Sequence, residues 1–221
     1  MDAMRMQSLL ICERILGITH KNMLFRLTFR GAAYADSLQL QRSIDLLRLL
    51  LEVRVEHCSI LHFDTCFAAQ ALVRMMLDWY ERHKRNRNAV SSVPVNIENN
   101  IDVQDQSLQF ADVYAVFRVM IDNIAEAQSL LQIRPVYRKQ QENFDRMLKC
   151  IVHLIYLLIG TGQTYEQKKL LFCAVKKLVA SNIRSACTYD TLLHLCVSRL
   201  NVIKSGYLTD NSSLTVVYFN V

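Results

Sequence analysis

The sequence has few of the residues that end helices and build turns. Only 2 of its 221 residues are Pro and 5 are Gly. Sandwiches and barrels of β-strands need frequent turns, so this scarcity argues against both. Hydrophobic residues make up 52% of the chain, which is enough for long helices to bury a sizeable core between them. The sequence therefore predicts an all-α fold.

The sequence also lacks an apolar run of the roughly 20 residues that a membrane-spanning helix needs. Its most apolar run, Cys150–Ile159, is much shorter and predicts a buried helix, with no membrane partner. The seven Cys include no CxxC pair, and the amino end lacks the features of a signal peptide, which predicts reduced thiols in the cytoplasm or nucleus. The net charge is +6, but the Lys and Arg residues are spread along the chain and alternate with 20 acidic residues. No nucleic-acid partner is therefore expected.

One group of residues has the spacing of metal ligands. Cys58, His62 and Cys66 would share a face if they lay on one helix. A helix cap expected at Asp64 or Thr65 separates them, and a fourth ligand is not evident. No metal is therefore expected.

No catalytic group and no cofactor is expected either. No Ser or Cys lies in a nucleophile elbow, and the sequence has no glycine-rich phosphate loop. His153, between two apolar neighbours, is expected to be a hydrogen-bonded core residue. The protein is thus predicted not to be an enzyme.

Leu24–His57 has the pattern of a tetratricopeptide repeat. Counted from Leu24, Leu27, Gly31 and Tyr34 occupy positions 4, 8 and 11, and Ser43 occupies position 20. These are the positions at which two antiparallel helices pack, expected here over residues 21–35 and 39–54. A mid-helix Gly costs about 1 kcal/mol relative to Ala, so Gly31 is expected to allow a close helix contact.

The same pattern assigns a binding surface. In tetratricopeptide geometry, positions 2, 5, 9 and 12 of the first helix line the concave side, where extended or helical peptides bind. The resulting peptide-contact candidates are Phe25, Thr28, Ala32 and Ala35.

Apolar periodicity predicts further helices over residues 2–16, 66–82, 108–131, 139–159 and 165–180. The first of these carries an apolar stripe that includes Leu9, Leu10, Ile15 and Leu16. The expected organisation is tetratricopeptide-like hairpins in 1–83, a polar linker in 84–107, further hairpins in 108–185 and a partial ankyrin repeat in 186–221.

The ankyrin prediction comes from the sequence TLLHLC, which is similar to the ankyrin signature TPLHxA. In that motif Thr191 would cap a helix and His194 would bridge backbone groups of adjacent repeats. Leu192, Cys196 and Leu200 also fit the loose pattern of an elongin-binding helix, in which one face enters a groove. Both interpretations remain open, because the same side chains of one helix could pack against neighbouring ankyrin repeats or bind elongin.

Four stretches in order, ERILGITH, FRGAAYADS, SLQFADVYAVF and the apolar helix Cys150–Ile159, resemble the Fem (feminization) family. Members of this family are substrate receptors of cullin-RING ubiquitin ligases. The resemblance implies ankyrin repeats that capture carboxy-terminal degrons, a central tetratricopeptide-like region, a second ankyrin set, and a box that docks elongin B/C and cullin. This chain is similar to the central part, without the first ankyrin array and the docking box, and is expected to be truncated.

The expected function is therefore a noncatalytic scaffold that takes part in protein ubiquitination and degron recognition. The alternative is a generic tetratricopeptide scaffold, such as a motor light chain or a chaperone cofactor, because ERILGITH is also similar to the helix ends of kinesin light chains.

Overall fold

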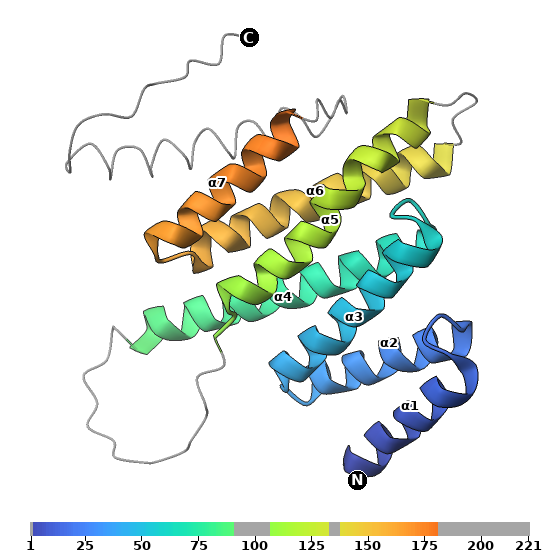
Figure 1. Ribbon diagram of the computed structural model, residues 1–221. Helices are drawn as coiled ribbons and strands as arrows, with labels where there is room; N and C mark the ends of the chain where they lie inside the picture. Colours follow the sequence, from blue (N-terminus) through green and yellow to red (C-terminus); the bar gives the residue numbers. More distant parts are fainter. Residues whose placement is uncertain (1, 91–106, 133–137, 181–221) are drawn as a thin grey trace, which may run out of the picture. The chain divides into compact units, whose positions relative to one another are not determined.

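A computed structural model describes residues 2–90, 107–132 and 138–180. These residues contain seven α-helices and no strand, so the all-α prediction is confirmed for them (Figure 1). The partial ankyrin repeat predicted in 186–221 lies outside the described residues. The helices are α1 (Asp2–Leu16), α2 (Lys21–Asp36), α3 (Leu40–Cys58), α4 (Phe63–Val90), α5 (Phe110–Gln132), α6 (Arg138–Thr161) and α7 (Tyr165–Ala180).

Each helix packs against helices that are near to it in the chain. α1 packs on α2, α2 on α3, and α3 on both α4 and α5. α6 packs on α4 and α5, and α7 packs on α5 and α6. Contacts restricted to near neighbours are typical of helical-repeat arrays, in which one unit stacks on the next.

Three helices, α2, α4 and α6, bury side chains in the same register, and we call them the A helices. Their buried residues share the spacing i, i+1, i+4, i+8 and i+11. These residues are Met23, Leu24, Leu27, Gly31 and Tyr34 in α2, Thr65, Cys66, Ala69, Val73 and Met76 in α4, and Asn143, Phe144, Met147, Ile151 and Leu154 in α6. α4 and α6 bury further side chains besides these five. The shared register shows that the three helices occupy equivalent places in the array.

The contact between α2 and α3 depends on small residues. A Cβ atom added to Gly31 would lie 2.7 Å from Cδ2 of Leu47, which is closer than packed carbon atoms approach. Ser43 is fully buried beside it, and its hydroxyl donates a hydrogen bond of 2.8 Å to the Gly31 carbonyl oxygen. Gly31 and Ser43 thus let the two backbones approach each other closely.

Three of the predicted helix boundaries are wrong: both ends of α4, and the end of α3, which extends to Cys58 instead of residue 54. α4 begins at Phe63, because Nδ1 of His62 accepts a hydrogen bond of 3.3 Å from the Asp64 amide, so neither Asp64 nor Thr65 is the cap. His20 caps α2 in the same way, through the Asn22 amide. α4 continues to Val90, past the predicted end at residue 82, because basic side chains favour the carboxyl end of a helix dipole.

The apolar stripe predicted for the first helix is also wrong. Within α1 only Leu9 is buried, whereas Leu10 and Ile15 are 55% and 74% exposed. Among the described helices α1 packs closely only on α2, so its other faces have no covering helix there. The leucine-rich α3, by contrast, packs against α2, α4 and α5.

Candidate peptide-binding face

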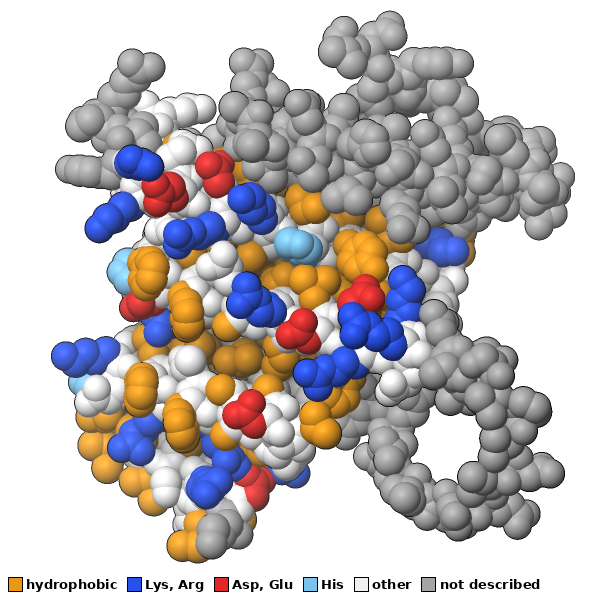
Figure 2. Space-filling model, turned by 180° about the vertical axis from the view of Figure 1, so that it is seen from behind, with side chains coloured by type: hydrophobic (Ala, Val, Ile, Leu, Met, Phe, Trp, Pro, Cys, Tyr) orange, Lys and Arg blue, Asp and Glu red, His pale blue; other side chains and the backbone are white. Residues whose placement is uncertain are grey.

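Large aromatic side chains are exposed on the first two A helices. Phe25 and Phe29 of α2 are 69% and 70% exposed, and Phe63 and Phe67 of α4 are 60% and 57% exposed. Each pair is four residues apart, so its members lie on one helix face. Figure 2 shows hydrophobic side chains on the surface of this amino-terminal half of the molecule, at the lower left of that view. Exposed aromatic side chains are typical of surfaces that bind other proteins.

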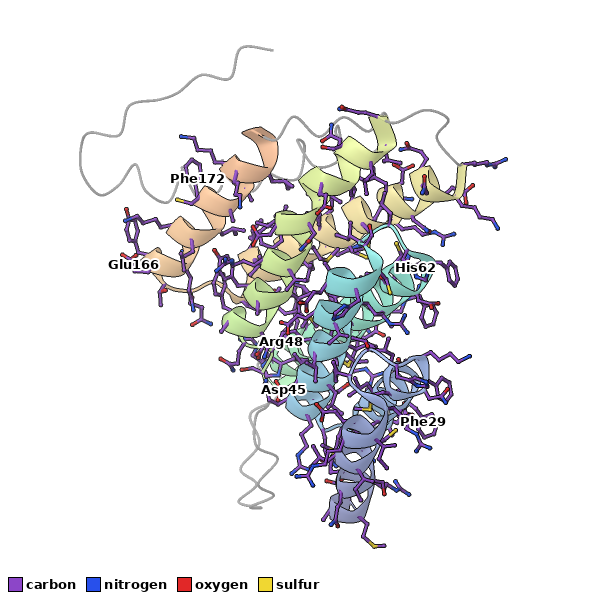
Figure 3. All side chains as sticks on the ribbon, turned by 45° about the vertical axis from the view of Figure 1, so that its right-hand side comes forward. Phe29, Asp45, Arg48, His62, Glu166 and Phe172 are labelled. Atoms are coloured by element: carbon purple, nitrogen blue, oxygen red, sulfur yellow. The ribbon has the colours of Figure 1, made fainter. Side chains whose placement is uncertain are left out.

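The four predicted peptide-contact residues lie along α2 but differ in exposure. Phe25 and Ala32 are exposed, whereas Thr28 and Ala35 are half-buried. The Thr28 hydroxyl donates to the carbonyl oxygen of Leu24 at 2.9 Å, a bond within its own helix. Phe29 was not predicted as a contact residue, although Figure 3 shows it projecting from α2.

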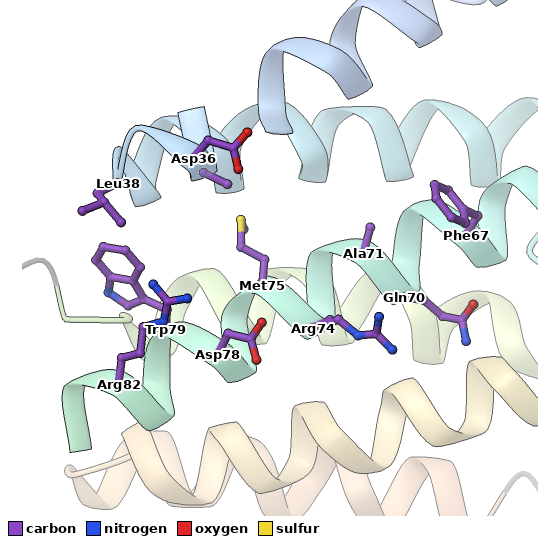
Figure 4. Close-up of a pocket in the computed structure, with 11 residues that line it drawn as sticks. Asp36, Leu38, Phe67, Gln70, Ala71, Arg74, Met75, Asp78, Trp79 and Arg82 are labelled. Carbon is purple, nitrogen blue, oxygen red and sulfur yellow. The ribbon is translucent and has the colours of Figure 1, made fainter. Parts of the chain in front are cut away.

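A hollow of about 470 Å³ lies between the carboxyl end of α2 and the length of α4 (Figure 4). α2 and the turn after it contribute Ala35, Asp36 and Leu38. The remaining lining residues all come from α4, namely Phe67, Gln70, Ala71, Arg74, Met75, Asp78, Trp79 and Arg82. We call this hollow the α2–α4 groove. Sequence reasoning placed only Ala35 in a binding surface and missed the contribution of α4.

Both signs of charge occur at the α2–α4 groove. Arg74 and Arg82 are exposed on α4, and Asp36 and Asp78 are exposed beside them. None of the four forms an ion pair within 4 Å of another described residue, so their charges face solvent. Charged groups around an apolar hollow can select a ligand by its charge.

The predicted packing residues of α2 and α3 do not line this groove, although the Ser43 hydroxyl lies 3.0 Å from the sulfur of the lining residue Met75. Leu27, Gly31, Tyr34 and Ser43 are all buried. The Tyr34 hydroxyl donates to the carboxylate of Asp2 at 3.0 Å, which joins α2 to α1. The Arg30 guanidinium lies 4.1 Å from the centre of the Tyr34 ring and pairs with the same carboxylate. Sequence reasoning missed this cluster, because it joins residues that are far apart in the chain.

The three cysteine and histidine residues considered as metal ligands are separated. Cys58 is exposed at the end of α3, and His62 caps α4. Cys66 is fully buried, and its thiol donates to the Ile60 carbonyl oxygen at 3.3 Å. Burial raises the pKa of Cys66 to about 11, so it is a thiol and not the thiolate that metals bind. Within the described ranges no three His, Cys, Asp or Glu side chains are grouped to hold a metal ion.

His153 is not a core residue, contrary to the prediction. It is exposed on α6, although its neighbours Val152 and Leu154 are buried. The helical period turns residue 153 to solvent between two buried positions, which its apolar neighbours in sequence conceal. The ankyrin-like and elongin-like candidates, Thr191, Leu192, His194, Cys196 and Leu200, lie outside the described residues.

Similar proteins were found along most of the chain. It is 30% identical over 196 residues to protein fem-1 homolog A of Bos taurus, across 89% of this chain and 27% of that protein. It is 40% identical over 91 residues to the sex-determining protein fem-1 of Caenorhabditis elegans, across 39% of this chain and 14% of the relative. The chain is homologous to the Fem-1 proteins. A shorter stretch of 53 residues is 47% identical to protein fem-1 homolog C of Bos taurus, across 24% of this chain and 9% of that protein.

The homology covers a limited part of the Fem-1 relatives themselves. The chain spans about a quarter of their length, with 27% of the Bos taurus homolog A aligned. No family model matches the sequence. Among the helices that the structure describes, none combines the length and the apolar character needed to cross a membrane.

Proposed function

We propose that the chain is a noncatalytic scaffold, the central helical region of a substrate receptor for a cullin-RING ubiquitin ligase. Its homology to Fem-1 proteins supports this proposal, together with the helical array that the sequence resemblance led us to expect. In this role the chain binds proteins that carry degrons, and elongin B/C and cullin join the same assembly. It acts in protein ubiquitination in the cytoplasm or nucleus.

The observation that carries the proposal is the exposed face of the A helices. The shared register buries one side of α2 and α4, while Phe25, Phe29 and Phe67 remain exposed on another side. Keeping large apolar side chains in water is unfavourable, at about 25 cal/mol for each Å² of apolar area. A face of this kind supports binding of another polypeptide, and no grouping of catalytic side chains competes with it among the described residues.

The proposal can be tested by purifying the tagged full chain from animal cells and identifying the proteins that accompany it. We expect proteins that accumulate when cullin activation is inhibited, and also elongin B/C and a cullin if Leu192, Cys196 and Leu200 supply a docking contact. Changing Phe25→Ser together with Thr28→Glu should remove those accumulating proteins. The control is Phe172→Ser, because Phe172 is 53% exposed but lies on α7.

A second variant tests how the ligase is recruited. If Leu192, Cys196 and Leu200 form an elongin-binding helix, Cys196→Asp should abolish recovery of elongin B/C while the accumulating proteins are retained. Recovery of motor or chaperone subunits in place of ligase subunits would instead show a generic tetratricopeptide scaffold, and the proposed function would be wrong.

A further inference from the structure

The A helices are joined in two different ways. Between α4 and α6, the side-chain amide of Asn143 donates to the Leu61 carbonyl oxygen at 2.9 Å, and the Tyr156 hydroxyl donates to Glu81 at 2.8 Å. The rings of Tyr80 and Tyr156 also meet edge to face, with centroids 5.9 Å apart. Between α2 and α4 the corresponding space is the α2–α4 groove. The array is therefore closed at one junction and open at the other.

One stripe of α4 forms the wall of this groove. Phe67, Ala71, Met75 and Trp79 succeed one another at intervals of four residues, and Figure 4 shows Ala71 and Met75 on the side of α4 that faces the hairpin of α2 and α3. At 470 Å³ the groove has the size of a small-ligand site and holds a few side chains, whereas a whole helix is about 10 Å across. It is thus suited to an extended segment that inserts apolar side chains.

The charge on the stripe changes along α4. Arg82 and Arg85 follow Met75 and Asp78 by two turns, so they continue the same face beyond the apolar wall. Both are exposed, and neither forms an ion pair with another described residue. The two acidic residues at the groove, Asp36 and Asp78, precede this basic end. The groove lining itself holds two arginines and two aspartates, and the face of α4 becomes cationic only at its end, at Arg82 and Arg85.

We infer that the α2–α4 groove binds an extended peptide whose apolar anchor side chains are followed by acidic residues. The anchors lie against Phe67, Ala71 and Met75, and the acidic residues lie at Arg82 and Arg85. Charge complementarity supports this occupant, since Arg82 lines the end of the groove, the exposed Arg85 follows it about one turn further along α4, and the whole chain carries a formal charge of +6. The inference deepens the proposed receptor function and rests on it for the class of partner.

The experiment uses two fluorescent peptides and the full chain. Both peptides carry the same leucine anchors, and one has acidic residues where the other has lysines. We expect the acidic peptide to bind at least about tenfold more tightly, and its affinity to fall as salt is raised. Equal binding of the two peptides, or preference for the lysine peptide, would overturn the inference.

Three variants locate the binding site. Ala71→Trp fills the groove from an exposed position and should weaken the acidic peptide by about tenfold or more. Arg82→Glu with Arg85→Glu should remove the preference for the acidic peptide. The matched control is Lys84→Glu, which makes the same change of charge as either arginine substitution alone, on the opposite side of α4, and should change affinity much less.

Circular dichroism checks that each variant is folded. If Ala71→Trp does not fold, the peptide affinities of the arginine variants test the inference by themselves. Unchanged affinity in the folded variants would contradict the inference. Selective peptide binding without recovery of the proteins that accumulate on cullin inhibition would disprove the proposed function but support the specificity of the groove. Recovery of those proteins without peptide selectivity would support the proposed function and disprove the inference about the groove.

Discussion

The junction between α4 and α6 and the junction between α2 and α4 occupy the same place in the repeat, but only the first is closed. The shared register allows residue-by-residue comparison. Asn143 of α6 corresponds to Thr65 of α4, and its longer side chain reaches Leu61 in the turn before α4. The buried Thr65 hydroxyl has no hydrogen-bond partner. One difference in side-chain length therefore separates a bonded junction from an unbonded one.

Two further pairs show the same contrast. Tyr156 of α6 corresponds to Asp78 of α4; the tyrosine reaches Glu81 on the preceding A helix, whereas the aspartate faces the groove. Gly160 corresponds to Arg82, and a Cβ atom at Gly160 would clash with the Tyr80 phenol. The closed junction thus depends on one long polar side chain, one tyrosine and one glycine. The shared register determines which helices pack against each other, and these few side chains determine how closely they approach.

Breaking the closed junction at Asn143 should have the largest effect. Asn143→Leu keeps the branched shape of the side chain but leaves the buried Leu61 carbonyl oxygen without its donor, which should lower the free energy of unfolding by about 2–3 kcal/mol. Urea denaturation of the full chain measures this loss. Gln141→Leu, at an exposed position on α6, is the control and should change stability little.

The second test removes the space for Tyr80. Gly160→Ala should cost about 1–3 kcal/mol through overpacking against the phenol ring. Combining it with Tyr80→Ala, which removes the phenol, should abolish this cost and leave only the gain of up to about 1 kcal/mol in helix propensity. An equal cost of Gly160→Ala in both backgrounds would show that the close approach of the two helices is not the cause.

A substitution at the open junction between α2 and α4 should raise the stability of the protein instead of lowering it. Thr65→Val replaces a buried hydroxyl that has no partner with a methyl group of similar size, so stability should rise by about 1 kcal/mol. Thermal unfolding of the two proteins measures the gain. A loss of stability would indicate that the Thr65 hydroxyl has a hydrogen-bond partner in solution.

Cysteine reactivity compares the closed junction with the surface. Burial raises the pKa of Cys66 to about 11 and that of Cys150 to about 12, so both stay protonated and unreactive at pH 8. Exposed Cys58 and Cys173 should react rapidly with a maleimide. Mass spectrometry of peptides from the labelled protein identifies the modified residues, and early labelling of Cys66 would contradict the closed junction.

The same two thiols predict a direction for stability against pH. Their folded pKa values lie above 9.0, the ordinary value of a cysteine thiol, so the stabilisation is fully present below pH 9. It should be lost as the pH rises from about 9 toward 11 or 12. Denaturation midpoints measured across this range should fall more for the native protein than for a Cys66→Ala, Cys150→Ala variant.

Sequence periodicity predicted the helices better than their surroundings. It predicted the bounds of α1 and α7, because Gly17 and the Gly160–Gly162 turn interrupt clear apolar patterns. It did not predict that α1 would bury only Leu9, since periodicity shows an apolar side but not which neighbours cover it. The histidine caps were missed because caps are usually Ser, Thr, Asp or Asn.

Half of the candidate site was predictable in principle. Phe25 followed from the tetratricopeptide positions, whereas Phe67 and the rest of the α4 wall were missed. A signal was present: His20, Phe25 and Asp36 recur in the same spacing as His62, Phe67 and Asp78. The openness of the α2–α4 groove could not be predicted, because it depends on how far side chains reach between helices that are distant in sequence.

Hydroxyl-radical footprinting in the presence of the acidic peptide tests the central claim most directly. The account predicts that the peptide protects Phe67 and Trp79 in the α2–α4 groove, while labelling of Phe172 on α7 is unchanged. Phe144, 1% exposed at the closed junction, should be unlabelled with or without the peptide. Protection of Phe172 instead of Phe67, or no protection at a saturating peptide concentration, would contradict the account.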